Sequence, residues 1–358
     1  MIAELFRSRA AALERAGRSQ LYVELMRGAA ADADAGGIVA SIFERDPATP
    51  ESVPELRLLA ALHDLVLRGR APELARYFPS AGGDAPPGGA WPVAARTLAE
   101  HEAFIRRRAR RSLQTNEPGR CVALYGGLLW LAERHRRPIR LLELGASAGL
   151  NLNADRFRYV VGGTPLGDPS SPLEFVEPWV GAPVGDPAEA AARLQIVARA
   201  GCDREPIDPA SPEGLLELRS YIWPDEPERL ARVMQAAAVA ERHGVTVERR
   251  SAAAWLAARL DDARPGVLTV IWQSVVNQYL EEAERDAIRS AFAGAGSSPL
   301  AWLTLEPPAH ADAGAGAGDR FELRCRERPE EDGSGDARLL ALAGYHGPPV
   351  VWRVTESP

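Results

Sequence analysis

Cysteine and histidine are scarce in this chain of 358 residues, which has three cysteines and six histidines. Cys121, Cys202 and Cys325 are odd in number and far apart, which argues against a disulfide framework or a cysteine zinc site. The histidines show no metal-ligand pairing. The sequence therefore predicts a protein without a metal ion.

Long apolar runs are also missing, since no stretch reaches the roughly 18 apolar residues of a membrane-spanning helix. The first residues lack the apolar core of a signal peptide. The net charge of -7 argues against a general nucleic-acid or membrane-surface binder. We expect a cytoplasmic protein that binds neither a membrane nor, given its charge, nucleic acid. Nothing in the sequence indicates the oligomeric state.

Residues 1–115 read as a helical N-terminal domain, because apolar residues recur there at helical spacing. His63 lies on one apolar stripe, which favours a hydrogen-bonded core histidine. Residues 91–113 are predicted to form one long helix that carries five arginines between 106 and 111. A run of charge favours a solvated helix face with one or two salt bridges over a grip on an anionic substrate.

The most informative stretch is residues 139–153. Residues 139–144 form a short apolar run, typical of a strand buried on both faces of a parallel sheet. Small residues follow at 145–149, and a helix is expected next. Three interpretations fit this turn: binding of a nucleotide-like cofactor, a nucleophile elbow of the form G-x-S-x-G, or a tight turn that binds nothing. The dinucleotide fingerprint G-x-G-x-x-G does not fit its spacing.

The rest of the chain alternates strands and helices. Residues 159–187 are expected to form an inserted flap, and strands are expected at 194–201, 245–248, 266–272 and 300–305. Three more strand-like segments at 321–326, 338–342 and 350–354 are separated by turns. The prediction is an α/β fold with a Rossmann-like, mostly parallel sheet and a C-terminal antiparallel meander, preceded by the helical domain.

Polar residues follow two of these strands. Asp203 comes after the expected strand at 194–201, where a carboxylate can accept hydrogen bonds from both hydroxyls of a ribose. The expected strand at 266–272 delivers Gln273, Ser274, Asn277 and Tyr279 to the same end of the sheet. We expect these four to position a substrate, although Tyr279 could simply pack and Asn277 could cap the next helix.

The chain resembles the class I S-adenosylmethionine-dependent methyltransferases. More specifically, it resembles an uncharacterised bacterial domain-of-unknown-function family placed beside those enzymes. The resemblance is carried by residues 114–117, 143–152, 201–203 with Pro206 and Asp208, 221–225, 274–276 and 278–279. It implies that residues 116–358 form a methyltransferase-like α/β domain.

The resemblance also implies roles. Glu143, Gly145 and Gly149 would lie beside the methionine part of S-adenosylmethionine, and Asp203 would hold its ribose. Ser251 and Ala252 would lie beside the adenine, and Gln273 and Ser274 would face the methyl group. The methyltransferase pattern has glycine where this chain has Ser147, and it often has an acid where this chain has Ser251. The full set of expected cofactor-binding residues is Thr115, Asn116, Glu117, Arg120, Glu143, Gly145, Ala146, Ser147, Gly149, Asn151, Asp203, Ser251 and Ala252.

The expected function is methyl transfer from S-adenosylmethionine to a small-molecule acceptor of unknown identity. The sulfonium is already an activated electrophile, so positioning is the enzyme's main task, and the acceptor leaves no motif. Two alternatives stay open. One is an α/β-hydrolase with Ser147 as nucleophile and a histidine from among His243, His310 and His346. The other is a protein that binds the cofactor without catalysis.

Overall fold

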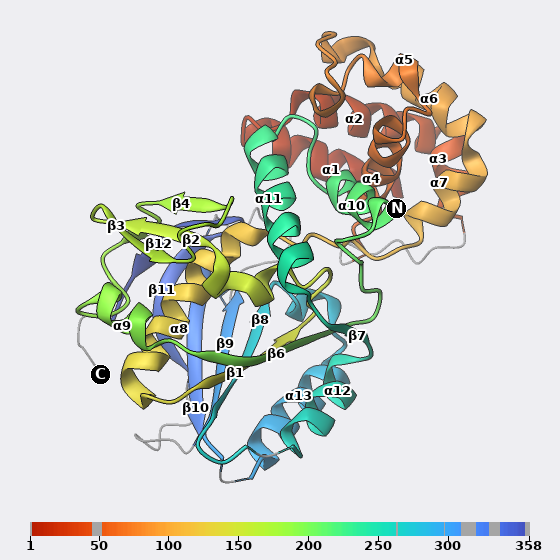
Figure 1. Cartoon of the computed structure of the whole chain (residues 1–358). Coiled ribbons are helices and arrows are strands. Elements are labelled where there is room, and N and C mark those ends of the chain that lie inside the picture. Colours follow the sequence, from red (N-terminus) through yellow and green to blue (C-terminus); the bar gives the residue numbers. More distant parts are fainter. Residues whose placement is uncertain are drawn as a thin grey trace. The chain divides into compact units, whose positions relative to one another are not determined.

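The computed structural model describes residues 2–44, 52–262, 264–296, 298–308, 320–328 and 337–354. The chain forms two compact units (Figure 1). Unit 1 comprises Met1–Thr115 and Ser211–Ala231, and unit 2 comprises Asn116–Ala210 and Arg232–Pro358. Residues 211–231, which we expected in the α/β domain, thus belong to the helical unit.

Unit 1 is helical. Its elements are α1 (Ile2–Arg15), α2 (Gln20–Asp34), α3 (Ile38–Ile42), α4 (Pro54–Leu67), α5 (Pro72–Ala75), two 3₁₀ turns (Pro79–Ala81 and Pro87–Gly89), α6 (Ala90–Glu100), α7 (Glu102–Ala109) and α10 (Pro212–Ser220). The helix α11 (Pro227–His243) begins in unit 1 and ends in unit 2. Phe6, Leu25, Leu58 and Leu62 are fully buried in the core of unit 1, as the helical spacing of its apolar residues predicts.

The long helix predicted at 91–113 is wrong in its extent, because the structure divides it at His101 and ends it at Ala109. His101 leaves helical geometry with φ -118° and ψ 24°. Its ring Nε2 lies 3.2 Å from the carbonyl oxygen of Arg70. Apolar periodicity does not register such a tertiary contact.

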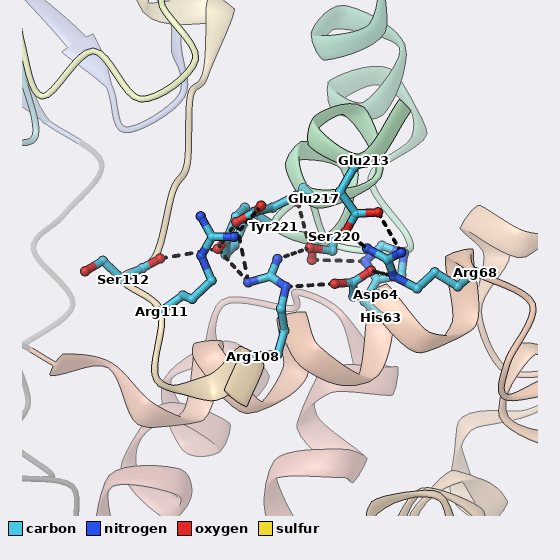
Figure 2. A network of polar contacts seen from close by, with 10 residues as sticks. All are labelled: His63, Asp64, Arg68, Arg108, Arg111, Ser112, Glu213, Glu217, Ser220 and Tyr221. Carbon is cyan, nitrogen blue, oxygen red and sulfur yellow. Dashed lines mark hydrogen bonds and ion pairs between the residues drawn. The ribbon is translucent and has the colours of Figure 1, made fainter. Parts of the chain in front are cut away.

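A polar network inside unit 1 joins α4, α7 and α10 (Figure 2). Arg108 donates to the Asp64 carboxylate, and another nitrogen of its guanidinium donates to the Tyr221 hydroxyl at 2.8 Å. Arg111 pairs with Glu217 at 2.7 Å. These contacts hold residues 211–231 in the helical unit.

The network also reveals what the arginine run does. Arg107 and Arg110 are exposed, as expected of a solvated face, but Arg108 is buried in the network. His63 is confirmed as a hydrogen-bonded core residue, because it is fully buried with its Nε2 2.7 Å from the Ser80 Oγ.

Unit 2 contains a nine-stranded sheet with the order β5-β12-β11-β10-β9-β8-β1-β6-β7. The strands are β1 (Ile139–Leu144), β5 (Trp179–Val180), β6 (Ile196–Asp203), β7 (Val247–Arg249), β8 (Leu268–Ser274), β9 (Leu300–Glu306), β10 (Phe321–Arg328), β11 (Arg338–Gly344) and β12 (Gly347–Trp352). β7, β6, β1, β8 and β9 are parallel, and β10 to β12 continue from β9 as an antiparallel meander. The predicted α/β architecture with a mostly parallel sheet and a C-terminal antiparallel region is confirmed.

The order of the parallel strands creates a switch point. From β1 the chain proceeds to β6 and β7 on one side and then returns to β8 on the other side of β1. Open α/β sheets bind ligands at the carboxyl ends of the strands where the order reverses in this way. All residues of β1 and β8 are buried, which matches their apolar sequences and central position (Figure 1).

Helices cover both faces of this sheet. Phe292 of α13 (Glu282–Gly294) packs on Trp302, with ring centroids 5.4 Å apart, and α12 (Ala252–Leu260) lies in the same apolar cluster. α8 (Cys121–His135) lies against Leu303, which a Cβ on Gly127 would approach to 3.0 Å. Because adjacent strand residues point to opposite faces, α8 and α13 lie on opposite sides of the sheet.

The expected flap region contains a small second sheet of β2 (Arg158–Val161), β3 (Thr164–Gly167) and β4 (Glu174–Val176), followed by α9 (Pro187–Arg193). Residues 179–180 of the same region add β5 to the edge of the main sheet. No helix among the described residues is long and apolar enough to cross a membrane.

Candidate functional site

The turn after β1 has an unusual backbone. Gly145, Ser147 and Gly149 all have positive φ, at 65°, 54° and 70°. A Cβ on Gly145 would lie 2.6 Å from a methyl group of Val276, and one on Gly149 would lie 2.2 Å from a methyl group of Val245. The two glycines are therefore required by conformation and by packing within the chain itself.

The helix expected after this turn is not an α-helix. Leu150–Arg156 forms the 3₁₀ helix η5, in which Asn153 departs from helical angles. The Asn116 Oδ1 accepts from the Leu150 N–H at 3.0 Å, and the Asn151 side chain bonds outside η5. Both bonds tie the start of η5 to groups outside it.

Glu143 is a buried carboxyl group on β1, one residue before the strand ends. Its Oε1 accepts from the Asn151 Nδ2 at 3.3 Å, and its Oε2 has no hydrogen-bond partner among the described residues. Burial raises the pKa of Glu143 to about 8, and the charge of Asp203 acts in the same direction against that of Arg120. A cation placed here would be stabilised by this carboxyl group as it ionises.

Asp203 ends β6, the strand next to β1. Its Oδ2 accepts from the backbone N–H of Ser147 at 2.9 Å, and its Oδ1 accepts from that of Glu205 at 2.8 Å. These two bonds fix the carboxylate against the glycine turn. The structure thus brings Asp203, Ser147, Glu143 and Asn151 together. Ala146 lies at the same place, fully buried, with its Cβ 2.5 Å from where a Cβ on Gly201 would be.

Residues 116–120 link this turn to the meander. Glu117 is fully buried, and its Oε1 accepts from the Gly119 N–H and from Arg232, both at 3.0 Å. Arg120 is buried and donates to the Tyr345 carbonyl at 3.1 Å. Glu117 is therefore held by protein partners, whereas Arg120 lies near enough to Glu143 to influence its pKa.

The end of β8 carries a second group of polar residues. The Gln273 Nε2 donates to the Asn277 Oδ1 at 2.6 Å and to the Glu306 Oε1 at 3.0 Å. The same Glu306 oxygen accepts from the Val276 and Asn277 N–H groups. Burial raises the pKa of Glu306. The sequence reading missed Glu306, although an acid that follows an apolar run at the carboxyl end of β9 is the same signal that identified Asp203.

The remaining expected residues are less closely associated. Ser274 is buried, but Tyr279 has 39% of its surface exposed. Ser251 is exposed at the N-terminus of α12, and the Ala252 N–H donates to Glu284 at 3.1 Å. Thr115 is the last residue of the first of the two segments that make up unit 1, whereas the other site residues belong to unit 2.

Ser147 has no base positioned to activate it among the described residues. Its Oγ is buried without a hydrogen-bond partner. His346 lies instead beside Glu117, 3.7 Å from its Oε2, and His243 lies among Arg156, Arg242 and Asp168. His310 lies outside the described residues.

Taken by fold and site, this is a doubly wound α/β protein with buried acids at the carboxyl ends of its central strands. The chain belongs to the family described as "Uncharacterized protein conserved in bacteria (DUF2332)", whose model matches residues 3–352. The comparison with curated proteins gave no match, and neither did that with solved structures.

Proposed function

We propose that the protein is an S-adenosylmethionine-dependent methyltransferase that acts on a small-molecule acceptor. The observation that carries the proposal is the buried carboxyl group of Glu143 at the switch point of the sheet, with one oxygen that has no partner among the described residues. A buried carboxyl group with a free oxygen suits a cationic ligand with hydrogen-bond donors. S-adenosylmethionine carries a sulfonium, an ammonium group and two ribose hydroxyls.

Asp203 supports the same cofactor. Its carboxylate lies at the end of the strand next to β1, where two backbone N–H groups fix its position. Carboxylate oxygens accept hydrogen bonds from hydroxyl groups. A ribose is a ligand with two adjacent hydroxyls. Glu143 and Asp203 would thus hold the two polar parts of the cofactor that flank its sulfonium.

The residues around the site then have only to bind and orient. The bound cofactor supplies an activated methyl group, so the protein's task is to align an acceptor with it. Gln273 and Asn277 are placed for this at the end of β8, where Glu306 fixes the Gln273 amide. The net charge of -7 favours a small molecule over a nucleic acid as acceptor.

Titration calorimetry with S-adenosylmethionine tests the proposal. We expect binding by the unmodified chain and a loss of about 1–3 kcal/mol of binding free energy in Asp203→Ala, which removes two acceptors. Asp261→Asn, which alters an exposed acid after α12, is the control and should bind like the unmodified chain. The absence of heat from folded protein at high cofactor concentration would refute the function. Binding without methyl transfer to any acceptor would favour the non-catalytic alternative.

A further inference from the structure

A second feature of unit 2 is a cavity of about 170 Å³. Its lining comes from the end of β8, from α13 and from β9 and β10, and includes Gln273, Arg285, Arg289, Trp302, Thr304 and Arg326. Gln273 pairs with Thr304 across β8 and β9, so the two side chains lie on one face of the sheet. This is the face that α13 covers, because Phe292 packs on Trp302, two residues from Thr304.

The charge of this cavity is positive. Arg285, Arg289 and Arg326 line it, and no acidic side chain does so among the described residues. Arg285 donates to the carbonyl oxygens of Asn277 and Leu280 and forms no ion pair with any residue that the structure describes. Arg326 has no ion pair or side-chain hydrogen bond within the described part of the chain. Arg289 pairs with Asp286 of its own helix, and both of these side chains are more than half exposed.

Two lining side chains also carry unsatisfied polar atoms. The orientation of the Gln273 amide is set by Glu306, whose Oε1 already accepts two backbone N–H groups and must face the Nε2. The Gln273 Oε1 is therefore a buried acceptor without a partner among the described residues, on a side chain only 1% exposed. The Trp302 Nε1–H is a buried donor that likewise has no partner in the described part of the chain. A buried polar atom without a partner is costly, and a bound ligand can remove that cost.

We propose that this cavity binds a small organic anion that also carries a hydroxyl or amino donor. The arginines would take the anionic group, and the Gln273 Oε1 would accept from the donor. Trp302, Leu280 and Ile288 provide an apolar lining suited to a flat hydrocarbon body. Gln273 and Asn277 line the cavity and also lie at the candidate site, so the cavity is the acceptor pocket of the proposed methyl transfer. That role rests on the proposed function, whereas binding of the anion does not.

The test uses three matched probes, 4-hydroxybenzoate, benzoate and phenol, titrated into the full-length protein in the absence of S-adenosylmethionine. The first probe has both the anion and the donor, and each of the others lacks one of them. We expect 4-hydroxybenzoate to bind best and Arg326→Gln to weaken it by about tenfold, the effect of one lost charge-assisted contact. Arg353→Gln, at an exposed arginine beyond β12, is the control and should bind 4-hydroxybenzoate like the unmodified chain.

Gln273→Leu removes the unpaired acceptor and should make 4-hydroxybenzoate and benzoate bind equally. Circular dichroism of each variant shows that the fold is retained. The inference is overturned if 4-hydroxybenzoate and benzoate both fail to bind at millimolar concentration, or if Arg326→Gln leaves the affinity for these two probes unchanged. Anion binding without cofactor binding would refute the proposed function and keep the pocket. Cofactor binding without anion binding would refute the anion pocket and keep the proposed function.

Discussion

Arg108 and Asp64 form a buried ion pair in unit 1, with the Arg108 Nε 2.7 Å from the Asp64 Oδ2 (Figure 2). The Asp64 side chain is fully buried, and Arg68 supplies its second partner at 2.6 Å. The other nitrogens of Arg108 donate to Tyr221 and to Ser220, which lie on the segment 211–231 that follows β6 in the sequence. One guanidinium therefore joins α4 to the segment 211–231.

Arg108→Met should destabilise unit 1 by about 3 kcal/mol, because removing one partner of a buried pair leaves the other charge uncompensated. The loss should lie at the lower end of the range for such pairs, because Asp64 keeps its ion pair with Arg68 and Glu217 keeps its ion pair with Arg111. Amide hydrogen exchange in α4 measures this loss of stability. Arg110→Met, two residues along on the exposed face, should change the exchange little, and equal effects of the two variants would contradict the assignment.

His63 should make unit 1 sensitive to acid. Burial lowers its pKa from 6.5 to about 4, so the folded unit binds this proton less readily than the unfolded chain does. The contribution of neutral His63 to stability is fully present above pH 6.5 and is lost as the pH falls from 6.5 to about 4. The total loss of unfolding free energy over this range is on the order of 3 kcal/mol. Exchange in α4 at a series of pH values measures this dependence. His63→Gln should flatten it, and an unchanged pH profile in that variant would exclude His63 as its source.

Gly149→Ala should lower the free energy of unfolding by more than the left-handed backbone conformation alone explains. Gly149 and Gly244 share a φ of 70°, but a Cβ on Gly244 meets nothing within 4 Å, whereas one on Gly149 meets Val245 and Val247. Gly244→Ala should cost about 1 kcal/mol of unfolding free energy for the left-handed backbone, and Gly149→Ala a further 1–3 kcal/mol, roughly, for overpacking. Urea denaturation of the two variants measures both losses. Similar losses of unfolding free energy in Gly149→Ala and Gly244→Ala would mean that the turn relaxes around the added methyl group.

Glu143 should make binding of S-adenosylmethionine depend on pH. Its pKa of about 8 leaves it protonated in the free protein at neutral pH, and a bound cation favours the carboxylate, so binding releases a proton. Affinity should rise by up to roughly tenfold per pH unit as the pH approaches that pKa from below. Calorimetry in two buffers of different ionisation enthalpy measures the released proton. Glu143→Gln should bind more weakly and release none, and proton release that persists in it would assign the effect to another group.

Ser147 separates the two enzyme classes. Ser147→Gly should retain or improve cofactor binding and leave stability within about 1 kcal/mol, because glycine relieves the positive φ of 54° but adds chain entropy to the unfolded state. A fluorophosphonate probe should leave the protein unlabelled. Covalent labelling that disappears in Ser147→Ala together with an esterase activity would establish the hydrolase instead.

Much of the sheet could be predicted from local pattern. The apolar run at 139–144 is buried along its whole length, and the expected starts of β6 to β11 agree with the observed starts within two residues, because buried strands have a short-range signature. The last strand, β12, begins three residues before its expected start at 350. Asp203 was found for a related reason, since a polar residue that follows an apolar strand falls at the edge of the sheet. The sequence also predicts the turn at Gly145 and Gly149, but Val276 and Val245, which leave no room for a Cβ at these positions, come from distant parts of the chain.

The alternation of strands and helices, the buried central strand and the polar residues at the strand ends can be predicted from the amino-acid sequence, because each depends on neighbours along the chain. The folded chain was needed to show that residues 211–231 join the helical unit, since Arg108 and Tyr221 are 113 positions apart. It was likewise needed to show that Glu117 is held by Arg232, and that Glu306 orients Gln273 from the next strand. In each case the deciding contact is a hydrogen bond or ion pair between distant residues, whose pairing no local periodicity encodes.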